Sequence, residues 1–190
     1  MILNPSLALD ADAIDRCVRR IAREIAERRG GVENLALIGI LRRGANLAER
    51  IAALLNENGG PCVAVGTLDI SSYRDDGKGS PGDPRLLGRH IPFSLDQRNV
   101  VLVDDVLYTG RTVRAALAAL ADLGRPHLVE LVAMIDRGER QLPIRADYVG
   151  KNIAAPEGQR VYVKLSEVDG VDAVVVGEHR PDPLSGKDRA

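Results

Sequence analysis

Two adjacent carboxylates and a loop of small hydroxyl residues lie close together in the middle of the chain. Asp104 and Asp105 follow the apolar run 100–103, and Thr109-Gly110-Arg111-Thr112 begins four residues later and opens a segment with helical spacing. Small residues at a helix N-terminus let backbone N–H groups converge on an anion, and the helix dipole adds partial positive charge. The acids repel an anion and suit hydroxyl groups or a metal ion. The hydroxyl loop and the acid pair together predict a ligand whose phosphate lies several ångströms from its hydroxyls, as in a ribose 5-phosphate. The alternative is that the acids only cap a helix.

Strands and helices must hold this loop in place. Helical spacing of apolar residues predicts three helices, over 13–29 with Asp10 or Asp12 as N-cap, over 45–56, and from the hydroxyl loop to 123. Apolar runs predict strands over 35–40, 62–70, 100–103 and 128–135, with short candidates at 148–153, 161–165 and 173–176. Because strands and helices alternate and the strands are continuously apolar, we expect an α/β fold with a parallel sheet covered on both faces. Ligands bind beyond the carboxyl ends of such strands, where the acid pair is expected.

Length and composition predict one ordinary domain. The 190 residues are 45% apolar with a net charge of -1, which excludes a globally basic nucleic-acid coat and wholesale disorder. We expect a single domain over 1–178, a long mobile loop over 71–89 and a disordered tail over 179–190. Cys17 and Cys62 form no metal-ligand pattern, and the sequence has neither a signal-peptide pattern nor an apolar run long enough to span a membrane. A cytoplasmic protein without a membrane partner is therefore expected.

Three stretches of the sequence resemble one enzyme family. Val100 to Asp105 followed by Thr109 to Thr112 is similar to the signature with which type I phosphoribosyltransferases bind 5-phosphoribosyl-1-diphosphate (PRPP). More narrowly, the stretches within 69–76, 103–114 and 136–152 resemble the pyrimidine operon attenuator and uracil phosphoribosyltransferase (PyrR) family. The resemblance implies the type I phosphoribosyltransferase fold, a central, mostly parallel sheet flanked by helices with a small hood and a flexible loop.

The resemblance also implies how PRPP and Mg²⁺ are held. Asp104 and Asp105 would be catalytic and would hold the ribose hydroxyls, directly or through Mg²⁺ and its waters. The remaining PRPP ligands implied are Arg42, Arg43, Gly44, Tyr73, Arg74, Tyr108, Thr109, Gly110, Arg111 and Thr112. Among them 109–112 would hold the 5′-phosphate, and 42–44 would meet the diphosphate after a cis peptide at Leu41-Arg42. Tyr73 and Arg74 would close over the diphosphate and exclude water.

The base is expected under a loop over 134–137. Backbone groups of Met134 and Ile135 would read it, Val106 would lie against its face, and Arg137, which we also count as catalytic, would lie near a carbonyl oxygen. Hypoxanthine-guanine enzymes carry an aspartate where this chain has Tyr108, so uracil is favoured, with UMP and diphosphate as products. Because Tyr108 occupies that position, no carboxylate is present there to remove the proton from uracil N1. Electrostatic stabilisation by Mg²⁺ and the diphosphate would then provide most of the catalysis.

Members of this family commonly bind a leader RNA of the pyrimidine operon more tightly with uridine nucleotides such as UMP or UTP. The RNA contacts that the resemblance implies are Arg20, Arg23, Arg28, Arg140, Arg145 and Lys151. Arg23 and Glu139 depart from the family, which has histidine at both positions, and the helical arginines also suit an ordinary solvated face with i, i+4 ion pairs. A homodimer or larger homo-oligomer is expected. Two alternatives stay open: a regulator with a nucleotide-sensing pocket and little catalysis, or a transferase for another base.

Overall fold

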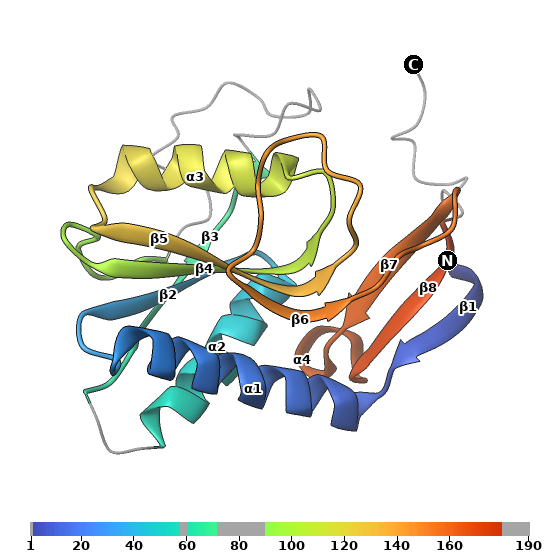
Figure 1. The fold of residues 1–190 in the computed structure, drawn as a ribbon, viewed down its shortest axis with the longest axis horizontal. Helices are drawn as coiled ribbons and strands as arrows, with labels where there is room; N and C mark the ends of the chain where they lie inside the picture. The colour runs from blue at the N-terminus through green and yellow to red at the C-terminus, as the bar shows by residue number, and fades with distance from the viewer. Residues whose placement is uncertain (1, 58–60, 72–89, 180–190) are drawn as a thin grey trace.

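A five-stranded parallel sheet forms the centre of the molecule. The computed structural model describes residues 2–57, 61–71 and 90–179, and the strand order of this sheet is β3-β2-β4-β5-β6 (Figure 1). Its strands are β2 (Leu35–Ile40), β3 (Ala64–Leu68), β4 (Asn99–Leu107), β5 (Leu128–Asp136) and β6 (Tyr148–Asn152). All neighbouring pairs in it are parallel, so the predicted α/β fold is confirmed.

Helices cover both faces of this sheet. The helices α1 (Ala11–Arg29) and α2 (Arg43–Asn56) pack on one face, and α3 (Arg111–Leu123) packs on the other (Figure 1). The apolar side of α1 is buried because its apolar residues recur at helical spacing. Asp10 is the N-cap of α1 and accepts a hydrogen bond from the Ala13 N–H at 2.8 Å, which settles the choice between Asp10 and Asp12.

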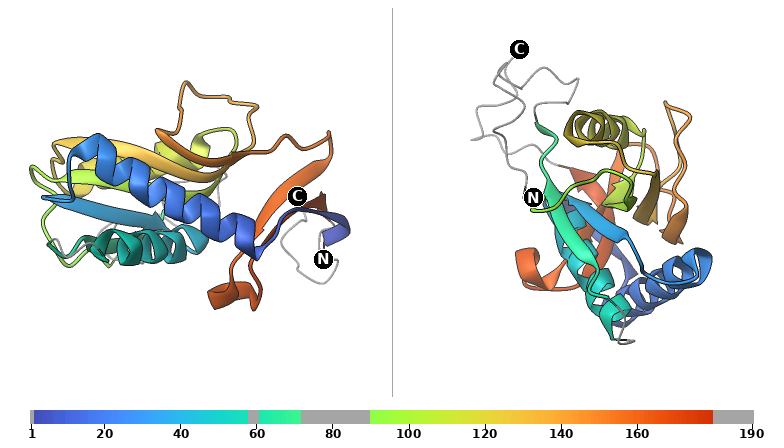
Figure 2. Two further views of the ribbon diagram at one scale, coloured as in Figure 1. Left: turned by 60° about the horizontal axis from the view of Figure 1, so that its bottom comes forward. Right: turned by 90° about the vertical axis from the view of Figure 1, so that its left-hand side faces the viewer.

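A second, smaller sheet forms the hood. It is antiparallel in the order β1-β8-β7 and consists of β1 (Ile2–Leu9), β7 (Gln159–Lys164) and β8 (Ala173–His179), with the short helix α4 (Ser166–Asp169) before β8. The hood lies at one end of the parallel sheet, beside the start of α1 (Figures 1 and 2). The sequence analysis missed β1, because most of its residues are exposed and it has no apolar alternation.

Two predicted strands end too early. The ladder between β4 and β5 continues past Val103, with Val106 opposite Ile135 and Leu107 opposite Asp136. The prediction stopped β4 at the first charged residue, although backbone pairing with β5 continues whatever the side chain. The strand predicted over 128–135 ends one residue before β5, which includes Asp136. Met134 and Ile135 belong to this strand, so the loop expected over 134–137 was wrong for these two residues.

Other boundaries differ by one to three residues. The helices α1 and α2 each begin two residues before the predicted start, because their first turns are polar and do not enter the apolar pattern. His179, predicted to begin the disordered tail, is the last residue of β8. The rest of that tail and nearly all of the predicted loop over 71–89 lie outside the described residues. Within the described ranges, no helix has both the length and the apolar character needed to cross a membrane.

Candidate active site

The acid pair lies at the carboxyl end of β4, inside the parallel sheet. Asp104 is opposite Ala133 of β5 and its exposed fraction is 5%. The Asp105 N–H donates to Oδ1 of Asp104 at 3.0 Å, and the Val106 N–H donates to Oδ1 of Asp105 at 2.9 Å. Burial raises the pKa of Asp105, and the positive charge of Arg43 acts in the opposite direction. The sheet therefore holds two carboxyl groups in fixed positions next to the end of the strand.

The residues of the acid pair suit a Mg²⁺ ion that is shared with a substrate. Within 2–57, 61–71 and 90–179, no cluster of three or more His, Cys, Asp or Glu side chains could hold a metal ion. Mg²⁺ is commonly bound by one or two carboxylates, while waters and substrate phosphates complete its octahedron. Asp104 and Asp105 supply that number of carboxylates. The donor set therefore fits an ion that a diphosphate and ribose hydroxyls help to coordinate.

The loop over 109–112, expected to bind a phosphate and called the cradle below, follows shortly after β4. Gly110 has a φ of 91°, in the left-handed region that favours glycine, and α3 begins at the next residue. The Thr109 hydroxyl accepts a hydrogen bond of 3.4 Å from the Arg111 N–H, the first of the helix. The backbone N–H groups of Gln141 and Leu142 donate to the Thr109 carbonyl at 3.0 and 3.2 Å. These bonds attach the cradle to the loop that follows β5. The turn and helix N-terminus expected from the sequence are confirmed, and both adjoin the acid pair.

The turn between β2 and α2 lies against the same strand end. It contains a cis peptide bond between Leu41 and Arg42, as the resemblance implied. A Cβ atom on Gly44 would lie 3.4 Å from the Asp104 Cα and far closer than a normal contact to the Val103 carbonyl oxygen. Only glycine therefore allows this turn to approach the acid pair so closely. The turn and the cradle thus flank Asp104 and Asp105.

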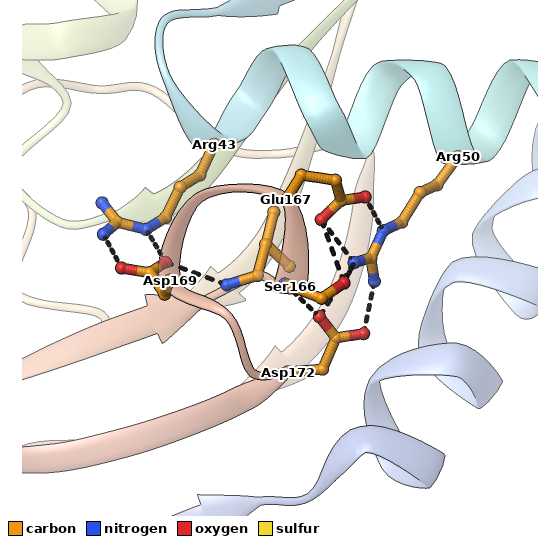
Figure 3. Close-up of polar contacts among 7 residues, drawn as sticks. Arg43, Arg50, Ser166, Glu167, Asp169 and Asp172 are labelled. Atoms are coloured by element: carbon orange, nitrogen blue, oxygen red, sulfur yellow. Dashed lines mark hydrogen bonds and ion pairs between the residues drawn. The ribbon is translucent and has the colours of Figure 1, made fainter.

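The side chain of Arg43 is bound by the hood (Figure 3). Its Nε and Nη2 atoms donate to the two carboxylate oxygens of Asp169 at 3.0 and 2.8 Å. Two turns along α2, Arg50 donates to Glu167 in α4 and to Asp172, which follows α4. These hydrogen bonds lower the pKa values of all three carboxyl groups below their ordinary range. The hood is thus fastened to α2, and the Arg43 guanidinium is engaged by Asp169 instead of extending freely towards a diphosphate.

The residues expected to bind the base lie on β4, on β5 and just after β5. Met134 and Ile135 are 1% and 0% exposed within β5, so their side chains lie in the core. Val106 is partly buried on β4, opposite Ile135. Arg137 is the first residue after β5, and its backbone N–H donates to the Leu107 carbonyl at 2.9 Å. The guanidinium carbon of Arg137 lies 3.9 Å from the ring centroid of Tyr108. Arg137 and Tyr108 therefore come together between the ends of β4 and β5.

Arg140, which is expected to contact RNA, makes hydrogen bonds within its own chain. Its guanidinium donates to the Asp136 carboxylate at 2.6 Å and to the carbonyl oxygens of Tyr108, Gly138 and Ile144 at 2.8, 3.0 and 3.0 Å. These groups belong to the loop after β4 and the loop after β5. Arg140 therefore joins the two loops that border the site, a role that the sequence analysis missed because its partners are mostly backbone carbonyls.

The remaining basic residues divide into two groups. Arg20 donates to the carbonyl oxygens of Val149 and Gly150 at 3.0 and 2.6 Å, and Arg28 lies 5.5 Å from the ring centroid of Tyr148. Both arginines thus attach α1 to β6. The other group is exposed and forms no ion pair or side-chain hydrogen bond within the described part of the chain; it consists of Arg23, Arg145 and Lys151. Tyr73 and Arg74 lie outside the described residues.

A buried carboxylate anchors the end of α1. Glu130 on β5 is 5% exposed and accepts hydrogen bonds from Arg29 Nε at 2.9 Å and from the Tyr148 hydroxyl at 3.0 Å. Arg28 adds a longer ion pair at 3.5 Å. Burial and the hydrogen bond to Glu130 raise the pKa of Tyr148. Glu130 therefore neutralises mainly Arg29, while Arg28, one of the predicted RNA contacts, stays 54% exposed.

Comparison with known proteins agrees with this geometry. Residues 8–164 match the family described as phosphoribosyl transferase domain. The chain is 57% identical over 166 residues to a Deinococcus deserti protein named "Bifunctional protein PyrR", which covers 87% of this chain and 91% of the relative. It is 54% identical over 170 residues to the protein of that name from Pelotomaculum thermopropionicum, covering 90% of this chain and 94% of the relative.

Solved structures confirm the fold. The hypoxanthine phosphoribosyltransferase of Staphylococcus aureus superposes with a TM-score of 0.67 at 20% identity and covers 93% of both chains. The enzyme of that name from Trypanosoma cruzi gives a TM-score of 0.68 at 20% identity, covering 92% of this chain and 97% of the other. The family match and the matches to the two relatives extend over most of the chain. The chain therefore belongs to the phosphoribosyltransferases and, among them, to the PyrR family.

Proposed function

We propose that this chain transfers the phosphoribosyl group of PRPP to uracil, and that it also binds a leader RNA of the pyrimidine operon as a nucleotide-dependent attenuator. One observation carries the enzymatic part: the acid pair near the end of β4 lies between the N-terminus of α3 and the first turn of α2, which contains Gly44. This arrangement separates a site for hydroxyl groups from two sites for anions. PRPP has that sequence of groups, a 5′-phosphate, ribose hydroxyls and a diphosphate.

The residues take the following parts in the reaction. Asp104 and Asp105 hold the ribose hydroxyls, while backbone N–H groups of 109–112 and the dipole of α3 hold the 5′-phosphate. Mg²⁺, when bound, supplies positive charge for the departing diphosphate. The turn over 42–44 presents Arg42, which is exposed and free of the Asp169 contact that holds Arg43. The site thus stabilises charge that develops as the glycosidic bond breaks.

Uracil is the base that the site favours. Val106 offers an apolar contact, and the Arg137 guanidinium has only hydrogen-bond donors, which suit a carbonyl oxygen. The residue before Thr109 is Tyr108, so no carboxylate is present there to act on a purine ring. Both relatives described above carry the name "Bifunctional protein PyrR", which supports a transferase activity combined with a second function.

Steady-state formation of diphosphate from PRPP and Mg²⁺ tests the enzymatic part. Uracil, orotate, cytosine, adenine, hypoxanthine and guanine are compared as acceptors. Turnover with uracil alone supports the proposal, and turnover with another base instead refutes the assignment of uracil. The double variant Asp104→Asn, Asp105→Asn should lose turnover while keeping its circular dichroism spectrum. If it stays active, the assigned PRPP site is wrong. UMP binding without any turnover would favour the nucleotide-sensing alternative.

The RNA-binding part is supported by the exposed basic group Arg23, Arg145 and Lys151, which lies on α1, β6 and the loop that precedes β6. We propose that these side chains contact RNA phosphates and that UMP or UTP strengthens this binding. Arg145→Ala should weaken leader-RNA binding and reduce its salt slope by about one. Arg160→Ala removes an exposed arginine from the hood and serves as the matched control. Equal affinities of the two variants would exclude Arg145 from the RNA surface.

We further propose that the protein works in the cytoplasm as a homodimer or larger homo-oligomer. A cytoplasmic location suits PRPP, uracil and the leader RNA as partners. Light scattering during size-exclusion chromatography measures the oligomeric state. A monomer at the concentration of the activity assay would refute this part without affecting the others.

A further inference from the structure

An exposed aromatic ring covers a buried cation beside the acid pair. Tyr108 is the first residue after β4, and its side chain is 37% exposed. Arg137 is the first residue after β5, and its side chain is only 8% exposed. The guanidinium carbon lies 3.9 Å from the ring centroid, which is the distance of a close cation–π stack. The ring therefore shields the arginine and limits the orientations of its guanidinium plane.

The stacked arginine has donors that the protein does not satisfy. Within the described part of the chain, the buried Nε atom has no hydrogen-bond partner. Its one ion pair in that part runs from Nη2 to Glu139, which is 56% exposed, over 3.5 Å. A buried donor without an acceptor is costly, so the protein binds this guanidinium less fully than an ordinary buried arginine.

Arg140 provides an internal comparison. It lies three residues after Arg137 on the same loop, yet its guanidinium donates to the Asp136 carboxylate and to several backbone carbonyls. The loop therefore contains one arginine bound by the protein and one held mainly by an aromatic ring. The guanidinium of Arg137 is therefore bound by the protein less fully than that of Arg140.

We propose that Tyr108 is a positioning residue for base recognition: its ring holds the guanidinium of Arg137, which would donate to a carbonyl oxygen of the base. This inference rests on the proposed uracil transferase function. It assigns the role to the face of the ring, so the phenolic hydroxyl is not required. It also moves Tyr108 from the PRPP phosphate site, where the resemblance placed it, to the base site.

Steady-state kinetics with Tyr108→Leu and Tyr108→Phe test the proposal. Tyr108→Leu should raise the KM for uracil about tenfold, which is about 1.4 kcal/mol and within the range of a partly desolvated cation–π contact. The KM for PRPP should change much less. Tyr108→Phe, which keeps the ring, should recover most of the loss. Leu117→Ala, which removes an exposed apolar side chain from α3, is the control and should leave both KM values unchanged.

A double-mutant cycle separates positioning from a general structural effect. If the ring acts through Arg137, Tyr108→Leu should have little further effect on the KM for uracil in the Arg137→Gln background. Additive effects of the two substitutions would overturn the proposal. So would a Tyr108→Phe variant as impaired as Tyr108→Leu, or a rise confined to the KM for PRPP. If the unsubstituted protein does not use uracil, the proposed function fails as well; if it does, these outcomes refute the role of Tyr108 alone.

Discussion

The close approach of Gly44 to the acid pair makes a substitution there informative. A Cβ atom at this position would lie under 3.0 Å from the Val103 carbonyl oxygen and 3.3 Å from its carbonyl carbon, whereas ordinary contacts begin at 3.4 Å. The obstacle is backbone of a central strand and cannot rotate away. Gly44→Ala must therefore push the first turn of α2 back by roughly 1 Å, a misplacement that costs about 10²-fold in rate.

The expected result is a fall of about 10²-fold in kcat/KM for UMP formation, or about 2.7 kcal/mol of transition-state stabilisation. Overpacking of this kind also lowers the free energy of unfolding by about 1–3 kcal/mol. Activity is therefore measured well below the midpoint of thermal unfolding, followed by circular dichroism. Under these conditions the variant is folded, and the loss reports the displaced turn.

Gly158→Ala is the matched control for this experiment. Gly158 has a φ of 80° and lies between β6 and β7, and a Cβ atom there would meet nothing within 4 Å. The substitution should lower stability by about 1–2 kcal/mol through backbone strain alone and leave kcat/KM unchanged. If Gly44→Ala keeps kcat/KM within about threefold of the unsubstituted protein, the close packing of this turn does not control the site.

Two further predictions concern the ion pairs that hold the fold together. Glu130→Gln leaves Arg29 without its buried carboxylate and should lower the free energy of unfolding by about 3 kcal/mol. This loss corresponds to a fall of about 6–12 °C in Tm, and an unchanged Tm would contradict the anchoring of α1. The lowered pKa of Asp172 means that its bond to Arg50 stabilises the fold fully above the ordinary pKa of 3.8, and that this contribution is lost at lower pH. Urea unfolding between about pH 5 and about pH 2.5 should therefore depend less on pH in Asp172→Asn, and identical slopes would refute this.

The sequence predicted the parallel sheet and the acid pair because both depend on local patterns. Apolar runs for buried strands and a glycine before a helix are visible within ten residues. Gly110 lies where that pattern places it, and Asp104 and Asp105 lie near the carboxyl end of the predicted strand, although inside β4 and not beyond it. Strand ends were less accurate, since a parallel ladder stops where its neighbour stops and not at the first polar residue. The strand predicted to end at Val103 continues to Leu107 for this reason.

Contacts between distant segments were not predictable in the same way. Arg43 and Asp169 are 126 positions apart, and nothing near either residue indicates the pair. In the sequence, an arginine that stays exposed cannot be told from one that, like Arg140, donates to carbonyl oxygens of its own chain. Only the tertiary structure separates Arg140 from the exposed Arg145. The residues that position a site were therefore harder to find than those that define it.

The hood joins the first and last strands of the described fold, which has a consequence for the order of folding during synthesis. Ser6 on β1 hydrogen-bonds to Val176 on β8, 170 positions later, so β1 waits roughly 10–30 s on the ribosome for its partner. Meanwhile β2 to β6 can pair, but the edge of β1 is open. Pro5 and two register shifts within β1 are features that discourage pairing with a wrong strand. The same irregularity that hides β1 from sequence patterns therefore protects it until β8 is made.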